Sequence, residues 1–112
     1  MIDQAFCPVF EAIELLQEKW VLHIVRALLP GPAGFNELSR RVGGVNPATL
    51  AQRLERLAEL GVVSREVHSL MPPRTSYALT QAGVELQSVI EAIDAWGRRH
   101  IADPAPLRSA AS

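Results

Sequence analysis

What the sequence lacks narrows its class before any motif is considered. It holds one cysteine, Cys7, so it can form neither an internal disulfide framework nor a cysteine-rich metal site. Its apolar runs are short, such as residues 27–29, and charged residues interrupt them, so we expect no membrane-spanning helix. The N-terminus has neither the basic region nor the long apolar stretch of a signal peptide. These absences predict a cytoplasmic protein without a membrane anchor.

Catalytic and ligand-binding patterns are also missing. No Ser/His/Asp pattern, glycine-rich phosphate loop or pair of carboxylates occurs in a setting that suggests a pocket. The histidines, His23, His68 and His100, lie far apart and follow no metal-ligand spacing. We therefore expect no enzymatic activity, no bound metal and no cofactor.

The length of 112 residues fits one domain with its own core, and a hydrophobic content of 48% argues for a folded protein. From residue 102 onward the chain is rich in Pro, Ala and Ser and has few apolar anchors. We expect a folded domain over residues 1–101 and a flexible tail over residues 102–112.

Charge is unevenly distributed along the chain, although the formal net charge is only −1. Residues 1–18 contain acidic side chains and no Lys or Arg, whereas residues 19–80 contain eight Lys and Arg against four Glu. A basic middle between acidic ends is typical of a DNA-facing segment flanked by structural helices. Chance clustering on a solvated surface is the alternative.

Helical periodicity begins at Pro8, where a proline at the first position of a helix costs no hydrogen bond. A second apolar helix is predicted from Lys19 to Leu29, and Pro30-Gly31-Pro32 ends it. A third, short helix is predicted with Asn36 as its N-cap.

Asn46-Pro47 predicts the start of a fourth helix, which runs to Leu60, with Gly61 ending it in a left-handed conformation. Strand formers follow over residues 62–67 and 75–79, with residues 68–74 as a protruding turn, and a long final helix starts near Thr80. This order predicts a mainly α fold with a small β-hairpin wing, a winged helix-turn-helix.

The fourth helix has a face suited to reading DNA. Leu50, Leu54 and Leu57 form a core stripe, and a polar face rich in hydrogen-bonding groups adjoins it. Gln pairs with adenine and Arg with guanine in the major groove, although a solvated helix face is the alternative. The residues expected to contact double-stranded DNA are Asn36, Arg40, Asn46, Thr49, Gln52, Arg53, Arg56, Arg65 and Arg74.

These features together resemble the HxlR-type regulators, a bacterial branch of the MarR-like winged-helix proteins. The resemblance rests on short motifs in matching order over residues 7–100: Cys7-Pro8-Val9, Lys19-Trp20, Gly34 to Leu38, Leu50 to Leu57, Gly61-Val62-Val63, Pro72-Pro73-Arg74, Tyr77 to Thr80 with Gly83, and Trp96-Gly97 with His100. The chain departs from the family pattern at Gln17-Glu18, where glycine is common, and at Asn46-Pro47-Ala48, where Ser and a basic residue are common. The family implies transcriptional repressors or activators that bind palindromic operators.

The resemblance also implies a homodimer formed through the first and last helices. The apolar stripe of the final helix is wider than a small domain needs for itself, which favours burial against a second chain. The expected interface residues are Val9, Ile13, Leu86, Val89, Ile90, Ile93 and Trp96. A winged helix that binds other proteins without reading bases is the alternative function.

Cys7 is a candidate redox sensor, because similar regulators use a cysteine in this Cys-Pro setting. The positive end of a helix dipole favours the reactive thiolate, whereas the nearby Glu11 and Glu14 disfavour it. The alternative is a structural, inert cysteine at the dimer interface. No effector molecule can be named from the sequence.

Overall fold

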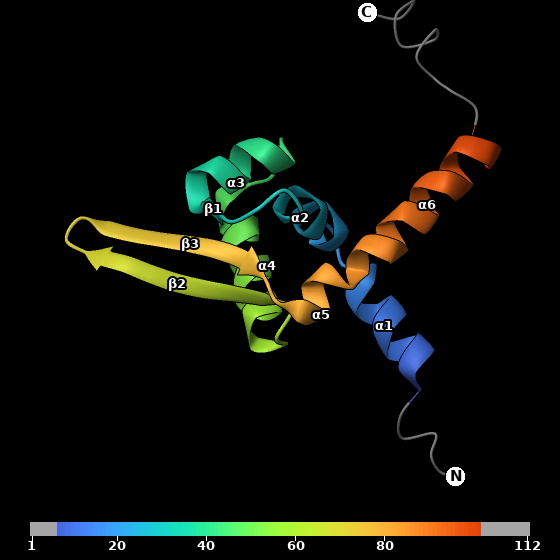
Figure 1. The fold of residues 1–112 in the computed structure, drawn as a ribbon, viewed down its shortest axis with the longest axis horizontal. Helices are drawn as coiled ribbons and strands as arrows, with labels where there is room; N and C mark the ends of the chain where they lie inside the picture. Colours follow the sequence, from blue (N-terminus) through green and yellow to red (C-terminus); the bar gives the residue numbers. More distant parts are fainter. Residues whose placement is uncertain (1–6, 102–112) are drawn as a thin grey trace, which may run out of the picture.

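The computed structural model describes residues 7–101, which form helices and one small antiparallel sheet (Figure 1). Its elements in chain order are α1 (Pro8–Leu16), α2 (Val21–Leu28), β1 (Ala33–Gly34), α3 (Phe35–Val42), α4 (Pro47–Glu59), β2 (Val63–Leu70), β3 (Pro73–Leu79), α5 (Gln81–Val84) and α6 (Leu86–His100). This order confirms the expected winged helix-turn-helix, with α3 and α4 as the helix pair and β2 with β3 as the wing. The tail expected over residues 102–112 lies outside the described residues.

The core lies where α2, α3, α4 and the base of the wing meet. In each helix the apolar residues recur at helical spacing, so they share one face, and that face is buried. Each such side chain stabilises the fold by about 1.5–3 kcal/mol through removal from water. The largest fully buried side chains are Val21, Ile24, Val25, Leu38, Leu50, Leu54, Leu57 and Val63.

The wing is longer than the sequence predicted. The strand order is β1-β3-β2, and the β2–β3 ladder continues past an irregularity after Val67 to a last pair between Leu70 and Pro73. The expected turn over residues 68–74 was therefore wrong, because most of it is strand. Backbone groups supply the ladder hydrogen bonds, so polar residues can extend it, and a proline is tolerated at the first position of a strand.

Two helix starts also differ from the prediction. The second helix does not begin at Lys19, because Trp20 takes a left-handed conformation with φ of 79° and acts as the N-cap of α2. The N-cap of α3 is Gly34 rather than Asn36. The physical reason is that β1 pairs with β3, and this pairing brings the chain in extended form to the start of α3.

The expected final helix is divided in two. Thr80 caps α5, because its hydroxyl oxygen accepts a hydrogen bond from the Gly83 N–H at 3.3 Å. The chain then turns at Glu85, and α6 leaves α5 at an angle (Figure 1).

α1 and α6 lie on the side of the molecule away from the wing tip (Figure 1). Neither α1 nor α6 has a fully buried residue, but Leu15 and Leu16 of α1 and Leu86 and Ile90 of α6 are partly buried and pack against the core. Among the helices of residues 7–101, none is long and apolar enough to cross a membrane.

Candidate nucleic-acid interface

The N-terminus of α4 is built as the sequence predicted. The Asn46 side-chain oxygen accepts hydrogen bonds from the backbone N–H groups of Ala48, at 2.8 Å, and Thr49, at 3.4 Å. Pro47 occupies the first helical position. The cap fixes where the helix starts and which way its first turn points.

α4 has one buried face and one open face. Leu50, Leu54 and Leu57 are buried, which confirms the predicted core stripe. On the open side Gln52 is exposed and Thr49 is half-buried. The small side chains of Ala48 and Ala51 lie in the same turns and are exposed too, so Gln52 is the long hydrogen-bonding group that this part of the helix presents.

The structure gives Arg53 and Arg56 partners within the chain. The Arg53 Nε–H donates to the backbone carbonyl of Lys19 at 2.9 Å. The Arg56 guanidinium forms a salt bridge with Glu18, with an Nη2–Oε2 distance of 2.7 Å. Both partners lie between α1 and α2, far from α4 in sequence, so a helical wheel of α4 could not show that these arginines are occupied.

The structure brings Asn36 and Arg74 together. Both line an open groove of about 620 Å³ between the start of α3 and the wing. His68, on the same groove, shares a hydrogen bond of 2.7 Å with the Ser76 hydroxyl. Arg65, on β2, is exposed.

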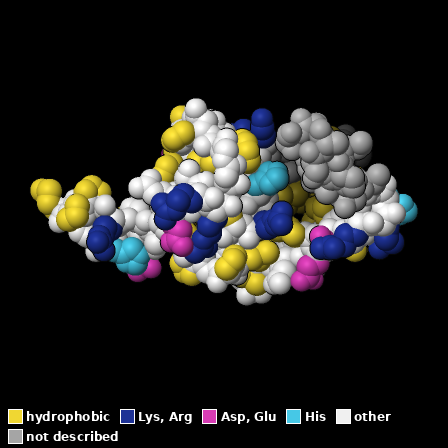
Figure 2. Space-filling view, turned by 90° about the horizontal axis from the view of Figure 1, so that it is seen from above, with side chains coloured by type: hydrophobic (Ala, Val, Ile, Leu, Met, Phe, Trp, Pro, Cys, Tyr) yellow, Lys and Arg dark blue, Asp and Glu magenta, His cyan; other side chains and the backbone are white. Residues whose placement is uncertain are grey.

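The basic residues of α3 have different roles. Arg41 donates to the carbonyl oxygens of Ala27 and Gly31, each at 3.0 Å, and forms a salt bridge with Glu37. Arg40, its neighbour, is exposed, and within residues 7–101 it has no ion pair. Figure 2 shows Lys and Arg side chains distributed along one face, from the projecting wing to the opposite end, with acidic side chains beside several of them.

Apolar side chains remain exposed on α1 and α6. Val9 and Ile13 on α1 are 67% and 55% exposed, and Ile93 and Trp96 on α6 are 51% and 55% exposed. Sequence reasoning missed Phe10, which is 58% exposed; its position three residues before Ile13 places it on the same side of α1. Of the other predicted interface residues, Val89 is half-buried, and Leu86 and Ile90 pack on the core of their own chain.

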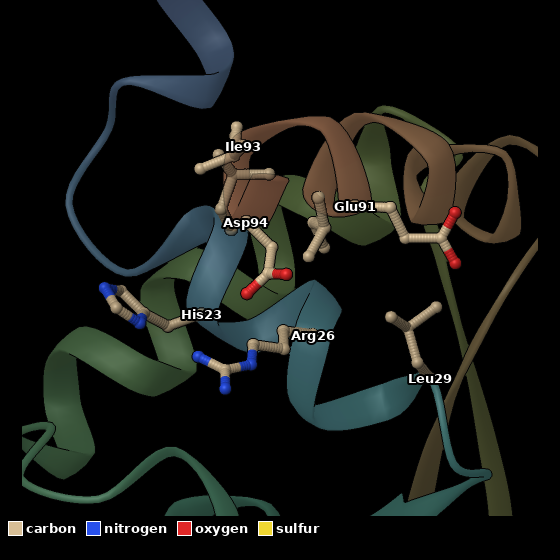
Figure 3. Close-up of a pocket in the computed structure, with 8 residues that line it drawn as sticks. His23, Arg26, Leu29, Glu91, Ile93 and Asp94 are labelled. Atoms are coloured by element: carbon tan, nitrogen blue, oxygen red, sulfur yellow. The ribbon is translucent and has the colours of Figure 1, made fainter. Parts of the chain in front are cut away.

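A pocket of about 500 Å³ is lined by residues of α2 and α6. His23 and Arg26 extend into this region from α2, and Ile93 and Asp94 from α6 (Figure 3). Asp94 also accepts a hydrogen bond from the Arg98 Nε–H at 2.8 Å, and this bond together with the carboxylate charge raises the pKa of Arg98. In the part of the chain that the structure describes, no cluster of three or more His, Cys, Asp or Glu could hold a metal ion.

Cys7 is a free, exposed thiol at the N-cap of α1. It therefore lies at the outer end of the helix that carries Val9, Phe10 and Ile13.

Comparison with known proteins decides the family. The profile of the HxlR-like helix-turn-helix domain matches residues 15–104, most of the chain. The chain belongs to this family. The transcriptional regulator YvaP of Bacillus subtilis is 35% identical over 96% of this chain and 99% of its own length. A regulator of Synechocystis is 34% identical over 81% of this chain and 67% of its own length.

Solved structures agree with this membership. A MarR-family transcriptional regulator from Porphyromonas gingivalis superposes with a TM-score of 0.80 at 26% identity, covering 90% of this chain and 99% of that chain. The reduced form of the regulator YodB from B. subtilis gives 0.75 at 32% identity, covering 86% and 95%. Members of the HxlR-like family are transcriptional regulators rather than enzymes, and this chain is a helix-turn-helix transcriptional regulator.

Proposed function

We propose that this regulator binds a palindromic operator in double-stranded DNA as a homodimer, with α4 of each chain in the major groove. The observation that carries the proposal is the open face of α4, where exposed Gln52 stands opposite the buried leucine stripe. Because one face of α4 packs on the core and the opposite face exposes the Gln52 amide, the helix is suited to reading bases. Because chromosomal DNA is its target, the protein acts in the cytoplasm.

Direct reading of bases belongs to the first turns of α4. Gln52 can pair through both polar atoms of its amide with the edge of adenine. Thr49 contacts a thymine methyl group or a phosphate. Asn46 caps the helix by accepting from the N–H groups of Ala48 and Thr49, and the positive end of the helix dipole favours a phosphate near this end. Arg53 and Arg56 are not included among the base-reading residues, because both have intrachain partners.

Phosphate contacts come from the elements on either side of α4. Asn36 and Arg40 lie on α3, and Arg74 shares the groove with Asn36. Arg65 adds a second cation on the wing. These charges position the protein on DNA without reading its sequence.

The homodimer forms through the exposed apolar side chains of α1 and α6. Large side chains such as Phe10, Ile93 and Trp96, each more than half exposed, favour burial against a second chain. One α4 per chain reads few bases, and two related by twofold symmetry read half-sites about 34 Å apart. Symmetry of the protein therefore implies an inverted repeat in the operator.

We also propose that oxidation of Cys7 regulates DNA binding. YodB has been solved in reduced, diamide-treated and quinone-bound forms, and the redox regulator HypR in reduced and oxidized forms; all match this chain with TM-scores of 0.69–0.76. With one cysteine per chain, two Cys7 thiols can pass two electrons and two protons to an oxidant such as diamide and form a disulfide between chains. Such a bond would fix the α1 helices relative to each other.

Selection of bound sequences from a random duplex pool tests the main proposal. We expect an inverted repeat, bound with an affinity that falls steeply as salt concentration rises, because phosphate contacts release counterions. A single asymmetric site bound by a monomer contradicts the proposal. Absence of salt-dependent DNA binding would instead support a protein-interaction module.

A further inference from the structure

We propose that Arg53 and Arg56 position the recognition helix instead of contacting DNA. They tie α4 to the turn over residues 17–20, which joins α1 to α2 and is here called the α1–α2 turn. In the homodimer these contacts set the distance between the two α4 helices and thereby the spacing of the two operator half-sites. The inference rests on the proposed function, in which α4 reads DNA and α1 contacts the second chain.

The contacts join α4 to the α1–α2 turn at consecutive residues. The Arg56 Nε–H lies 2.9 and 2.8 Å from the carboxylate oxygens of Glu18, and Nη2 completes a forked pair at 2.7 Å. The Arg53 Nε–H donates to the Lys19 carbonyl at 2.9 Å. Arg53 and Arg56 are three residues apart on one side of the helix, so both can face the turn.

The α1–α2 turn is itself firmly held. The Glu18 N–H donates to the Leu15 carbonyl at 3.2 Å, and the Val21 N–H donates to the Glu18 carbonyl at 3.1 Å. Trp20 packs against the core while its backbone is left-handed, a conformation that a residue other than glycine keeps only where its surroundings enforce it. A turn held in this way can transmit position between the elements that it joins.

The turn follows α1 directly, since Glu18 stands two residues after the last residue of α1. The first turns of α1 carry the exposed Val9 and Phe10, whereas Leu15 and Leu16 at its end are partly buried and pack against the core. The direction of α1 relative to the DNA-reading domain is therefore set at this end of the helix, by these two leucines and by the turn that follows them. One path from the second chain to the recognition helix runs through α1, the α1–α2 turn and the arginine contacts, and α6, which packs on α2, provides another.

The geometry of the Arg56–Glu18 pair indicates that it orients α4 and contributes little to the free energy of folding. Side chains of Arg56 and Glu18 remain 47% and 26% exposed, and ion pairs this open add little to the free energy of folding. A forked arginine–carboxylate pair does, however, fix direction, because both hydrogen bonds constrain the guanidinium plane. The Glu18 carboxylate engages Nε and Nη2 of Arg56 and offsets the guanidinium charge, which makes Arg56 a weaker phosphate ligand than an unpaired arginine.

Operators whose half-sites are moved apart or together in single base-pair steps test the inference. Binding is measured for the unmodified protein, Arg56→Gln, Glu18→Gln and the reversed pair Glu18→Arg with Arg56→Glu. Arg98→Gln is the matched control, since it removes the same charge and breaks a 2.8 Å pair with Asp94 that lies within one helix. Circular dichroism establishes whether each variant is folded. If Arg56→Gln does not fold, Glu18→Gln still tests the Arg56–Glu18 contact from its other side.

We expect the unmodified protein and Arg98→Gln to lose about tenfold or more in affinity per base pair of displacement, a loss like that caused by a mismatched base pair. Arg56→Gln and Glu18→Gln should lose less than about threefold, because a loosened α4 adapts to the spacing. The reversed pair should restore the strict preference. The slope of log affinity against log salt concentration should stay unchanged in Arg56→Gln.

Strict spacing retained by Arg56→Gln and Glu18→Gln would overturn the inference and leave the proposed function intact. A salt slope reduced by about one unit in Arg56→Gln would also overturn it, because the residue would then be contacting a phosphate. An unmodified protein that shows no spacing preference would refute the homodimeric operator itself, and the inference with it.

Discussion

Gly83 offers the sharpest test of how the DNA-binding domain is packed. It is a buried residue of α5, and a Cβ added there would overlap the Val62 carbonyl oxygen and lie 2.9 Å from Leu79 Cδ2. The carbonyl cannot easily move, because it accepts a hydrogen bond from the Thr80 N–H at 3.0 Å. Alanine at this position therefore forces α5 away from the base of the wing.

The size of the effect can be worked from these contacts. Overpacking against a fixed backbone destabilises by about 3 kcal/mol, at the upper end of its usual range. Weakening one Thr80 hydrogen bond adds about 1 kcal/mol. The better helix propensity of alanine offsets about 1 kcal/mol of this loss in the free energy of unfolding. We expect Gly83→Ala to lower the free energy of unfolding by about 3 kcal/mol, a drop in Tm on the order of 10–20 °C.

Thermal unfolding followed by circular dichroism at one fixed protein concentration measures the effect. The matched control is Gly97→Ala in α6, where the added Cβ would meet only Ile101 Cδ1 at 3.9 Å among the described residues. This control should keep or raise Tm, because alanine is the better helix former and adds up to about 1 kcal/mol to the free energy of unfolding. A Gly83→Ala variant as stable as the unmodified protein would refute the packing argument.

The remaining predictions concern DNA binding and assembly. Asn46→Ala should cost about 1 kcal/mol of stability and weaken operator binding, as measured by melting and fluorescence anisotropy, because α4 loses its cap. Gln52→Ala should change the preferred operator sequence by about 1–3 kcal/mol at one base pair, and unchanged selection results would exclude base contact. Arg74→Ala should weaken binding to all sequences and flatten the salt slope by about one unit; an intact slope would remove the wing from the interface. Ile93→Asp should give monomers in light scattering, and a persistent dimer would place the interface elsewhere. Diamide should form a covalent dimer and alter operator binding only where Cys7 is present, so identical binding by oxidised protein and Cys7→Ser would make Cys7 structural.

Local sequence determined the parts of the fold that depend on neighbouring residues. Asn46 caps α4, and the leucines at positions 50, 54 and 57 are buried, as helical spacing predicts. Gly61 follows α4 with φ of 78°, the left-handed conformation that glycine adopts without strain. These features involve residues within a few positions of one another, so their physical causes are visible in the sequence.

Tertiary structure decided which of the predicted site residues are available. Arg53 and Arg56 contact residues 34 and 38 positions away, and no helical periodicity contains that information. The cap of α3 moved to Gly34 because β1 pairs with a strand formed much later in the chain. Such pairings depend on how distant elements meet, so the sequence alone left them open.

In the apolar stripe of α6, too, the sequence predicted the apolar face but not which part of that face is covered by the rest of the chain. Its sequence predicted one continuous surface, but Leu86 and Ile90 pack on the core, while Ile93 and Trp96 stay more than half exposed. Hydrophobic periodicity identifies a face that avoids water, and it does not identify what covers that face. The turn at Glu85 and the packing of α6 on α2 determine where the helix leaves its own core. The sequence therefore determined that α6 is amphipathic, and the tertiary structure determined which part of it is free for a second chain.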